Sequence, residues 1–447
     1  MSQSLDRHPA VIAFLDRVCA QVRAKEMHAE IRHEMLNHLE ELTAEREALG
    51  DKNEEEALEE ALRQMGDPEQ VGKQLHTVHK PKPEWSVIAL VAGMIAIGLV
   101  SLFALQLSLD GQLSLGRKLA FGFAGVAAMF ALYFADYRRL FRYSWPLYIV
   151  TVLLLIVVNQ QSLAVNGAKQ WLLLGPFSVN VYALSPYLLI IGAAGILMQK
   201  KPIARGLRER ALSAAKETVL FILVPAYFYL MAPAFAYLTV YAVGLAVLLV
   251  VSGRGRLLLA SFGGLSLALV YFVVYRTHSA SFWQRIDAYL NPGAHADDRG
   301  FLTLRSLEAL RSGGLWGQGF GIPNRRLPYV TDELVYSYLV YSLGWVFGIV
   351  VAGIALLFIV RTVRMGVKLQ DRYAKGLVVS LSAVLGIQLV WTMLMCTGLL
   401  PSLSMTLPVM NWNANTVIEL AVVGLMLGAY RRKDMFRPSS EPALTTN

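Results

Sequence analysis

The chain has 447 residues, of which 55% are hydrophobic and 16% are charged, and its mean hydropathy is +0.47. This composition excludes a string of ordinary soluble domains and is typical of a protein whose solvent is the bilayer. The net charge of +9 could indicate a nucleic-acid partner, but the basic residues after Lys80 lie in short loops between apolar runs, where they act as topology signals. The two cysteines, Cys19 and Cys396, give neither a disulfide nor a zinc-ligand spacing, so no resident metal site is predicted.

Residues 9–78 predict a small soluble bundle of three or four amphipathic helices, because apolar side chains recur there at steps of three and four residues. The run Gly66-Asp67-Pro68 is typical of one helix that ends at glycine and a second that begins with an aspartate cap and a proline in its first turn. We therefore expect a cytoplasmic helical domain over residues 1–80. A linker at 81–85 follows, in which proline interrupts the helix.

The rest of the chain carries ten hydrophobic runs that predict membrane-spanning helices. They lie at about 86–107, 117–136, 144–158, 181–199, 216–233, 234–252, 256–276, 334–361, 376–397 and 413–430. The connecting loops alternate strictly between basic and less basic, which predicts that both termini are cytoplasmic. The predicted fold class is therefore all-α, with a polytopic membrane domain over residues 86–433 and a cytoplasmic tail at 434–447. The hydrophobic run 218–252 could also be one re-entrant unit.

This topology places one long segment, residues 277–333, on the outer side of the membrane. Long loops are usually functional or disordered, and this one is rich in Trp, Tyr, Arg and Gly, so we expect it to be ordered. Its arginines suit a phosphate-bearing ligand, although a solvated loop that meets anionic lipid or teichoic acid is an alternative. They are Arg285, Arg299, Arg305, Arg311, Arg325 and Arg326. The glycine-rich run 313–321 lacks a Walker lysine and predicts tight turns whose backbone approaches a ligand or another loop.

The outer segments also carry short motifs in a fixed order. These are Asn166-Gly167-Ala168-Lys169-Gln170-Trp171, Leu174-Gly175-Pro176-Phe177, Arg285, Asn291-Pro292, the run from Ser312 to Gly321, Thr331-Asp332, Gly398-Leu399-Leu400-Pro401 and Thr406-Leu407-Pro408. In order, spacing and topology the chain resembles, from about residue 86 to 433, the SEDS family of bacterial cell-wall proteins, which is the FtsW, RodA and SpoVE group. Residues 9–78 are similar to the HAAS-type prefix domain found ahead of some membrane proteins.

The resemblance implies a peptidoglycan glycosyltransferase that polymerises lipid II at the outer face of the bacterial cytoplasmic membrane, in cell-wall synthesis, cell division and cell shape. It also implies a partner, a single-span class B penicillin-binding protein that supplies transpeptidation. In this chemistry the 4-hydroxyl of one sugar attacks the anomeric carbon of the other strand and expels undecaprenyl pyrophosphate. A carboxylate of the long outer loop is the proposed base, and cationic side chains or a divalent cation, Mg²⁺ or Mn²⁺, would neutralise the pyrophosphate.

The resemblance assigns candidate residues position by position. The family pattern Asn-Pro-x-x-Asp begins here at Asn291, but His295 occupies the aspartate position and Asp297 follows two residues later. These two residues are the candidate catalytic bases. The candidate substrate-binding residues are Lys169, Trp171, Arg285, Arg299, Arg305, Arg325, Thr331 and Asp332.

Several polar positions of the family pattern carry other residues in this chain. A glutamate after the fourth-span entry is replaced by Ala183, an aspartate by Ala234, and a pair of glutamates by Tyr341-Ser342. The usual Ser-Tyr-Gly-Gly-Ser becomes Asn411-Trp412-Asn413-Ala414-Asn415. These losses leave the enzymatic activity an open question.

Glu419 is a polar residue gained inside the last span, where an ionisable side chain is costly. It indicates either a function or a neutral glutamic acid hydrogen-bonded to Gln388 or Thr392. Three functions therefore stay open: a divergent lipid II polymerase, a weak or inactive scaffold that binds lipid-linked precursor or a penicillin-binding protein, and a polyprenyl-lipid transporter. In the transporter, Glu419 and Gln388 would line the path.

Overall fold

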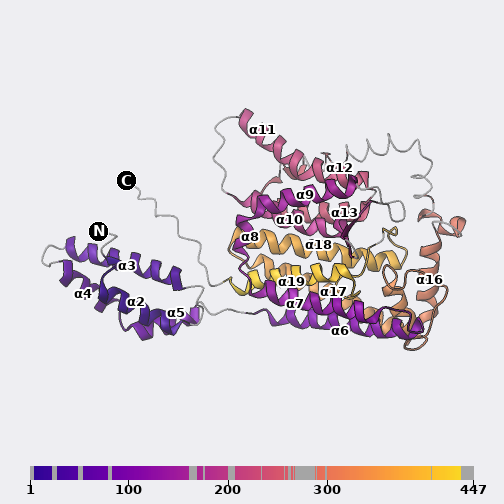
Figure 1. Cartoon of the computed structure of the whole chain (residues 1–447), viewed down its shortest axis with the longest axis horizontal. Coiled ribbons are helices and arrows are strands. Elements are labelled where there is room, and N and C mark those ends of the chain that lie inside the picture. The colour runs from indigo at the N-terminus through magenta and orange to yellow at the C-terminus, as the bar shows by residue number, and fades with distance from the viewer. Residues whose placement is uncertain are drawn as a thin grey trace. The chain divides into compact units, whose positions relative to one another are not determined.

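The structure, a computed structural model, is mostly helical (Figure 1). The residues that it describes are 5–22, 28–48, 54–78, 83–160, 169–174, 177–199, 207–232, 234–255, 257–259, 263–264, 266, 287, 289–296, 300–403 and 405–433. The chain forms two compact units, one of Met1–Pro83 with Arg431–Asn447 and one of Glu84–Tyr430.

The N-terminal bundle consists of four described helices. They are α2 (Pro9–Gln21), α3 (His28–Ala48), α4 (Glu54–Gln64) and α5 (Pro68–Val78). Their apolar faces meet in a core that includes Val11, Val18 and Leu39. The predicted stop and start between α4 and α5 is confirmed, because Gly66 has a φ of +84° and the Asp67 carboxylate accepts the backbone N–H groups of residues 69 and 70.

The second unit includes ten described helices besides α8 and α16, all of them apolar except the polar helix α11. They are α6 (Trp85–Ser108), α7 (Leu115–Phe134), α9 (Ser144–Gln160), α10 (Val181–Met198), α11 (Leu207–Thr218), α12 (Val224–Met231), α13 (Phe235–Val251), α17 (Val335–Val367), α18 (Arg372–Cys396) and α19 (Ala414–Arg431). Within the described residues, six helices are long and apolar enough to cross a membrane, and α9 and α13 are apolar but shorter. Eight of the nine predicted spans other than 256–276 each coincide with one of these helices, whereas span 216–233 comprises the end of α11, a π-helical turn and α12. Span 256–276 lies largely outside the described residues.

Two short helices lie across opposite ends of this bundle (Figure 1). The basic helix α8 (Arg138–Arg142) lies at one end, and α16 (Phe301–Gly313) lies at the other. A small antiparallel hairpin of β1 (Trp171–Leu174) and β2 (Phe177–Asn180) precedes α10. Of the long segment 277–333, the structure describes residues 287, 289–296 and 300–333, which include α16 and the turns that follow it, and the remainder lies outside the described residues.

The hydrophobic run 218–252 forms two helical segments, and the first contains a π-helical turn, η2 (Val219–Leu223). The Val224 N–H bonds to the carbonyl of Val219, and Pro225 has no N–H, so the carbonyls of Leu220 and Phe221 lose their usual helical donors. Two tyrosine hydroxyls replace those donors. Tyr148 on α9 donates to the carbonyl of Leu220, and Tyr241 on α13 donates to that of Phe221 at 2.6 Å. Side chains of neighbouring helices thus supply the hydrogen bonds that the backbone loses at this π-helical turn inside an apolar bundle.

Two helical glycines make room for the indole of Trp412. A Cβ atom at Gly98 on α6 or at Gly122 on α7 would overlap the Trp412 ring. Trp412 itself is 5% exposed and has a φ of +49°. The tryptophan of the Asn411–Asn415 motif therefore fits between α6 and α7 because glycine, which has no side chain, faces it on each helix.

We predict that Gly122→Ala lowers the free energy of unfolding by about 1–3 kcal/mol, because a methyl group would overpack the indole site. Gly98→Ala should have a similar effect. Gly93→Ala on α6 is the control, since its Cβ would meet only Ile354 Cδ1, at 4.0 Å. Thermal unfolding of the purified proteins in one detergent measures the difference, and equal melting temperatures for the Gly122 and Gly93 variants would contradict the packing argument.

Candidate functional site

The glycine-rich run after α16 packs against a break in α17. Gly344 has φ +88° and ψ 171°, which interrupts the helix. Across the break, Trp345 N donates to the carbonyl of Gly314 and Gln318 N to that of Tyr341, both at 2.9 Å. A Cβ at Gly317 or Gly344 would overlap the facing backbone. The predicted tight turns are confirmed, and their backbone approaches another part of the chain, the break in α17.

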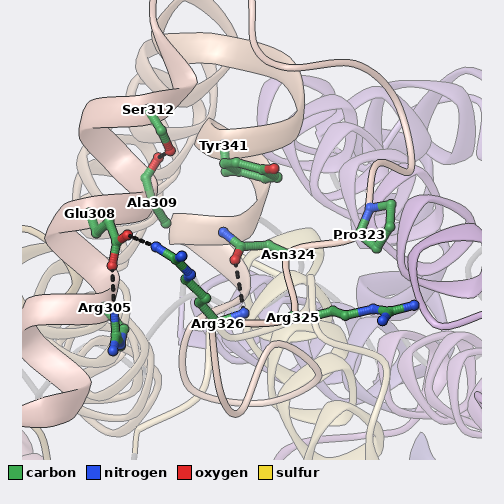
Figure 2. Close-up of a pocket in the computed structure, with 9 residues that line it drawn as sticks. All are labelled: Arg305, Glu308, Ala309, Ser312, Pro323, Asn324, Arg325, Arg326 and Tyr341. Carbon is green, nitrogen blue, oxygen red and sulfur yellow. Dashed lines mark hydrogen bonds and ion pairs between the residues drawn. The ribbon is translucent and has the colours of Figure 1, made fainter.

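These backbone hydrogen bonds position a pocket of about 380 Å³ between α16, the following loop and α17 (Figure 2). The lining residues are Arg305, Glu308, Ala309, Ser312, Pro323, Asn324, Arg325, Arg326 and Tyr341. We call this hollow the arginine pocket. Two predicted substrate-binding residues, Arg305 and Arg325, are brought together here. Tyr341, where the resemblance implies a glutamate, contributes a phenol to the lining of this pocket.

The charges of the arginine pocket are arranged around Glu308. Figure 2 shows the guanidinium groups of Arg305 and Arg326 reaching this carboxylate, at 2.7 Å and 3.1 Å, while Arg325 extends away from it. The hydrogen bond from Arg305, and to a smaller extent the one from Arg326, lowers the pKa of Glu308. The Glu308 carboxylate therefore stays ionised at neutral pH. Three guanidinium groups and one carboxylate leave an excess of two positive charges, which favours an anionic ligand.

Glu308 was missed by the sequence reasoning, although a signal existed. It lies three residues after Arg305 on a helix, a spacing at which opposite charges pair. Arg305 also makes a cation–π contact with Phe301, because its guanidinium carbon lies 5.2 Å from the centre of the Phe301 ring. The pocket therefore presents an arginine that is oriented before any ligand binds.

His295, the first candidate base, ends a short 3₁₀ helix, η3 (Pro292–His295). Its Nε2 atom lies 2.8 Å from Oδ2 of Asp287, and Asn291 Nδ2 donates to Oδ1 of the same carboxylate at 2.9 Å. The hydrogen bond from His295, and to a smaller extent the one from Asn291, lowers the pKa of Asp287. Asp287 was also missed by the sequence reasoning. The other candidate base, Asp297, lies outside the described residues, as do Arg285 and Arg299.

The remaining candidate substrate-binding residues do not line the arginine pocket. Lys169 and Trp171 are half-buried, and Trp171 begins the β1–β2 hairpin. Thr331 and Asp332 belong to a separate network, in which Lys118 Nζ on α7 donates to the carbonyl of Thr331 at 3.3 Å. The Thr331 hydroxyl donates to the Asp332 carboxylate at 2.9 Å. These two residues therefore tie the outer segment to α7.

Glu419 is 3% exposed and lines a second, much smaller pocket together with Gln388 and Ala183. The prediction that Glu419 is hydrogen-bonded to Gln388 or Thr392 was wrong. The Glu419 carboxylate accepts the backbone N–H of Val409 at 2.7 Å. Gln388 Nε2 instead donates to the hydroxyl of Tyr187 at 2.9 Å, and the Thr392 hydroxyl donates to the carbonyl of residue 406.

The reason for this bond is the backbone of the loop before α19. Val409 has a φ of +65°, a costly conformation for a β-branched residue, and its buried N–H needs an acceptor that the loop does not supply. The pocket measures about 20 Å³, enough for about one water molecule and too small for a lipid headgroup. The position therefore supports a structural role and disfavours a lipid path.

We predict that Glu419→Met lowers the free energy of unfolding by about 1–3 kcal/mol, because the Val409 N–H would be left buried without an acceptor. Glu419→Gln keeps an acceptor oxygen of the same reach and should retain most of the stability. Thermal unfolding of both variants in one detergent provides the measurement. Equal losses in the two would show that the charge matters and the hydrogen bond does not.

The chain is similar to known proteins over most of its length. The family profile described as cell cycle protein, that of FtsW, RodA and SpoVE, matches residues 84–434. Over 329 residues the chain is 28% identical to a probable peptidoglycan glycosyltransferase FtsW of Geobacter metallireducens, covering 72% of this chain and 86% of the relative. It is 24% identical to stage V sporulation protein E of Bacillus subtilis, covering 79% and 99%.

Solved structures share the fold. One, from work on the structural coordination of polymerization and crosslinking by a peptidoglycan synthase complex, matches with a TM-score of 0.64 and 25% identity, covering 78% of this chain and 98% of that chain. The rod shape determining protein RodA of Thermus thermophilus matches with a TM-score of 0.57 and 24% identity, covering 78% and 97%. With its apolar spans, the chain is a bacterial membrane protein, and it belongs to the SEDS family of FtsW, RodA and SpoVE.

Proposed function

We propose that this protein is a peptidoglycan glycosyltransferase that polymerises lipid II at the outer face of the cytoplasmic membrane. The observation that carries the proposal is the arginine pocket, in which three guanidinium groups of the outer segment gather around one carboxylate. The relatives named as peptidoglycan glycosyltransferases and the match over residues 84–434 supply the reaction class. A lipid-linked pyrophosphate is the anion that this chemistry would present to the pocket.

The proposed reaction needs a base and a cationic site. Either His295 or Asp297 would take the proton of the attacking sugar hydroxyl. Arg305, Arg325 and Arg326 would stabilise the charge that develops on the departing pyrophosphate. Preorganised positive charge beside the departing pyrophosphate is the main contribution that these arginines would make to the rate.

The donor set of the arginine pocket does not fit a resident divalent cation. Its carboxylate, Glu308, is already bonded to two guanidinium groups, and a cation would face their repulsion. We therefore propose that any Mg²⁺ or Mn²⁺ used in the reaction arrives with the pyrophosphate of the substrate.

We also propose a class B penicillin-binding protein as the partner, which the likeness to a peptidoglycan synthase complex supports. Both termini would be cytoplasmic, because the basic helix α8 and the outer helix α16 lie at opposite ends of the bundle (Figure 1). Residues 1–80 would form a HAAS-type prefix domain that binds a regulatory partner. Deleting them should leave membrane insertion intact, and failed insertion would instead indicate a role in topology.

The proposed function is tested by polymerisation of lipid II. The purified protein, alone and with its cognate penicillin-binding protein, is reconstituted in liposomes with fluorescent lipid II, and products are separated on a gel. A ladder of glycan strands is expected. If every reconstitution leaves lipid II unpolymerised, although the protein is folded, the enzymatic proposal fails.

A scaffold without activity is the second candidate, and Ser342 favours it. Ser342 takes one of the paired glutamate positions, where its hydroxyl donates to the carbonyl of Gly319 at 2.8 Å and accepts the Gly321 N–H at 3.3 Å. A position that carries a carboxylate in the family pattern is thus used here to hold backbone. A scaffold would keep full function in cells in the double variant His295→Ala/Asp297→Ala. A null phenotype at normal protein level would count against it.

A further inference from the structure

We infer that Asp287 is a positioning residue that holds the His295 ring so that its Nδ1 atom accepts the proton of the attacking sugar hydroxyl. The inference rests on the proposed function and deepens it, because it names the accepting atom and the group that orients it. The geometry that carries it is the 2.8 Å contact between His295 Nε2 and Asp287 Oδ2.

The contact fixes the tautomer of the ring. An ionised carboxylate can only accept hydrogen bonds, so the nitrogen that faces Asp287 carries the proton. In the neutral imidazole the other nitrogen, Nδ1, then holds a free lone pair. Without Asp287 both tautomers would be available, and only one of them presents Nδ1 as a base.

Further bonds hold this pair in place. Asn291 Nδ2 donates to the second oxygen of Asp287 at 2.9 Å, so neither carboxylate oxygen is left without a donor. On the ring side, Gly300 N donates to the carbonyl of His295 at 3.0 Å, which closes the turn that carries the histidine. Tyr289, between Asp287 and the turn, donates its hydroxyl to the carbonyl of Leu399 at 2.7 Å. This last bond links the segment to the loop after α18.

At position 295 this chain has a histidine where the resemblance implies an aspartate, and a histidine base works better with a neighbouring carboxylate such as Asp287. A carboxylate base needs no orientation of tautomers, whereas an imidazole does, and its protonated form gains from a nearby negative charge. Asp287 supplies both. A negative charge thus lies in direct contact with the proposed base, through the 2.8 Å bond between Asp287 and His295.

The proposed step is a group transfer at the anomeric carbon of the donor sugar. The acceptor hydroxyl oxygen forms a new C–O bond to the anomeric carbon of the donor sugar, and its proton passes to His295 Nδ1. The bond from that carbon to the pyrophosphate breaks, and its electron pair leaves on the pyrophosphate. The imidazolium, with both ring nitrogens protonated, is stabilised by Asp287 and afterwards returns its proton to water.

The first test is Asp287→Asn in the full-length protein, assayed by lipid II polymerisation across a range of pH. We expect kcat to fall by about 10²-fold with KM nearly unchanged, because orientation of the base is lost while substrate contacts remain. The fall in kcat should appear at every pH at which the unmodified protein is active, because the orientation of the ring is lost. Asp110→Asn, at an exposed aspartate of the loop between α6 and α7, is the control and should change neither quantity.

The second test separates positioning from a purely structural role. In a His295→Asp background the base has no tautomer, so adding Asp287→Asn should cost little and could relieve repulsion between two carboxylates. Equal losses from Asp287→Asn in both backgrounds, or activity like that of Asp110→Asn, would overturn the inference while the proposed function stands. Absence of polymerisation by the unmodified protein would instead remove the proposed function itself.

Discussion

The His295→Ala variant is expected to polymerise lipid II about 10²- to 10⁴-fold more slowly than the unmodified protein, with a similar KM. The reason is that His295 is the proposed base, at the position where the resemblance implies an aspartate, and its ring is hydrogen-bonded to Asp287. Initial rates at several substrate concentrations, with the reconstituted protein, give kcat and KM separately.

Two companion variants make this result specific. His295→Asp restores the residue of the family pattern and should recover much of the activity. Asp297→Ala tests the other candidate base in the same assay. If His295→Ala polymerises within about twofold of the unmodified protein and Asp297→Ala does not, the base is Asp297 and the role given to His295 is wrong.

The double variant Arg305→Ala/Arg326→Ala is expected to lower kcat/KM by about 10²-fold or more. A hydrogen bond to a charged group contributes about 1.5–3 kcal/mol, and two such donors to a pyrophosphate would be lost together. The same change leaves Glu308 without its two partners and removes the pocket's excess of two positive charges, so its attraction for the anion would be lost. Initial rates and binding of undecaprenyl pyrophosphate measure the two effects.

A matched control and a change of opposite sign sharpen this prediction. Arg311→Ala removes an exposed arginine of α16 that does not line the pocket, and it should have little effect. Glu308→Gln releases two guanidinium groups and should strengthen binding of the pyrophosphate. If Arg311→Ala is as damaging as the double variant, general attraction to the basic segment explains the data and the pocket does not.

The helices could be predicted because their determinants are local. A run of apolar residues long enough to cross the bilayer must pair its backbone within the segment, so the span from 181 to 199 needed no knowledge of its neighbours. The same holds for the end of α4 and the start of α5, where Gly66, Asp67 and Pro68 each act within one turn. The boundaries of α17 were predicted less well, because the helix continues past residue 361 to Val367.

The partners of the polar side chains were decided only by the tertiary structure. Glu419 was correctly singled out as unusual, but its acceptor role at Val409 depends on a strained loop that no local pattern reveals. In the same way, Arg305 and Arg326 are 21 residues apart, and they meet at Glu308 because the break at Gly344 lets the glycine-rich run pack against α17. Apolar burial and backbone pairing are set by the residues of one segment, whereas an ion pair or a hydrogen bond needs two groups within about 3 Å, and only the folded chain brings them there.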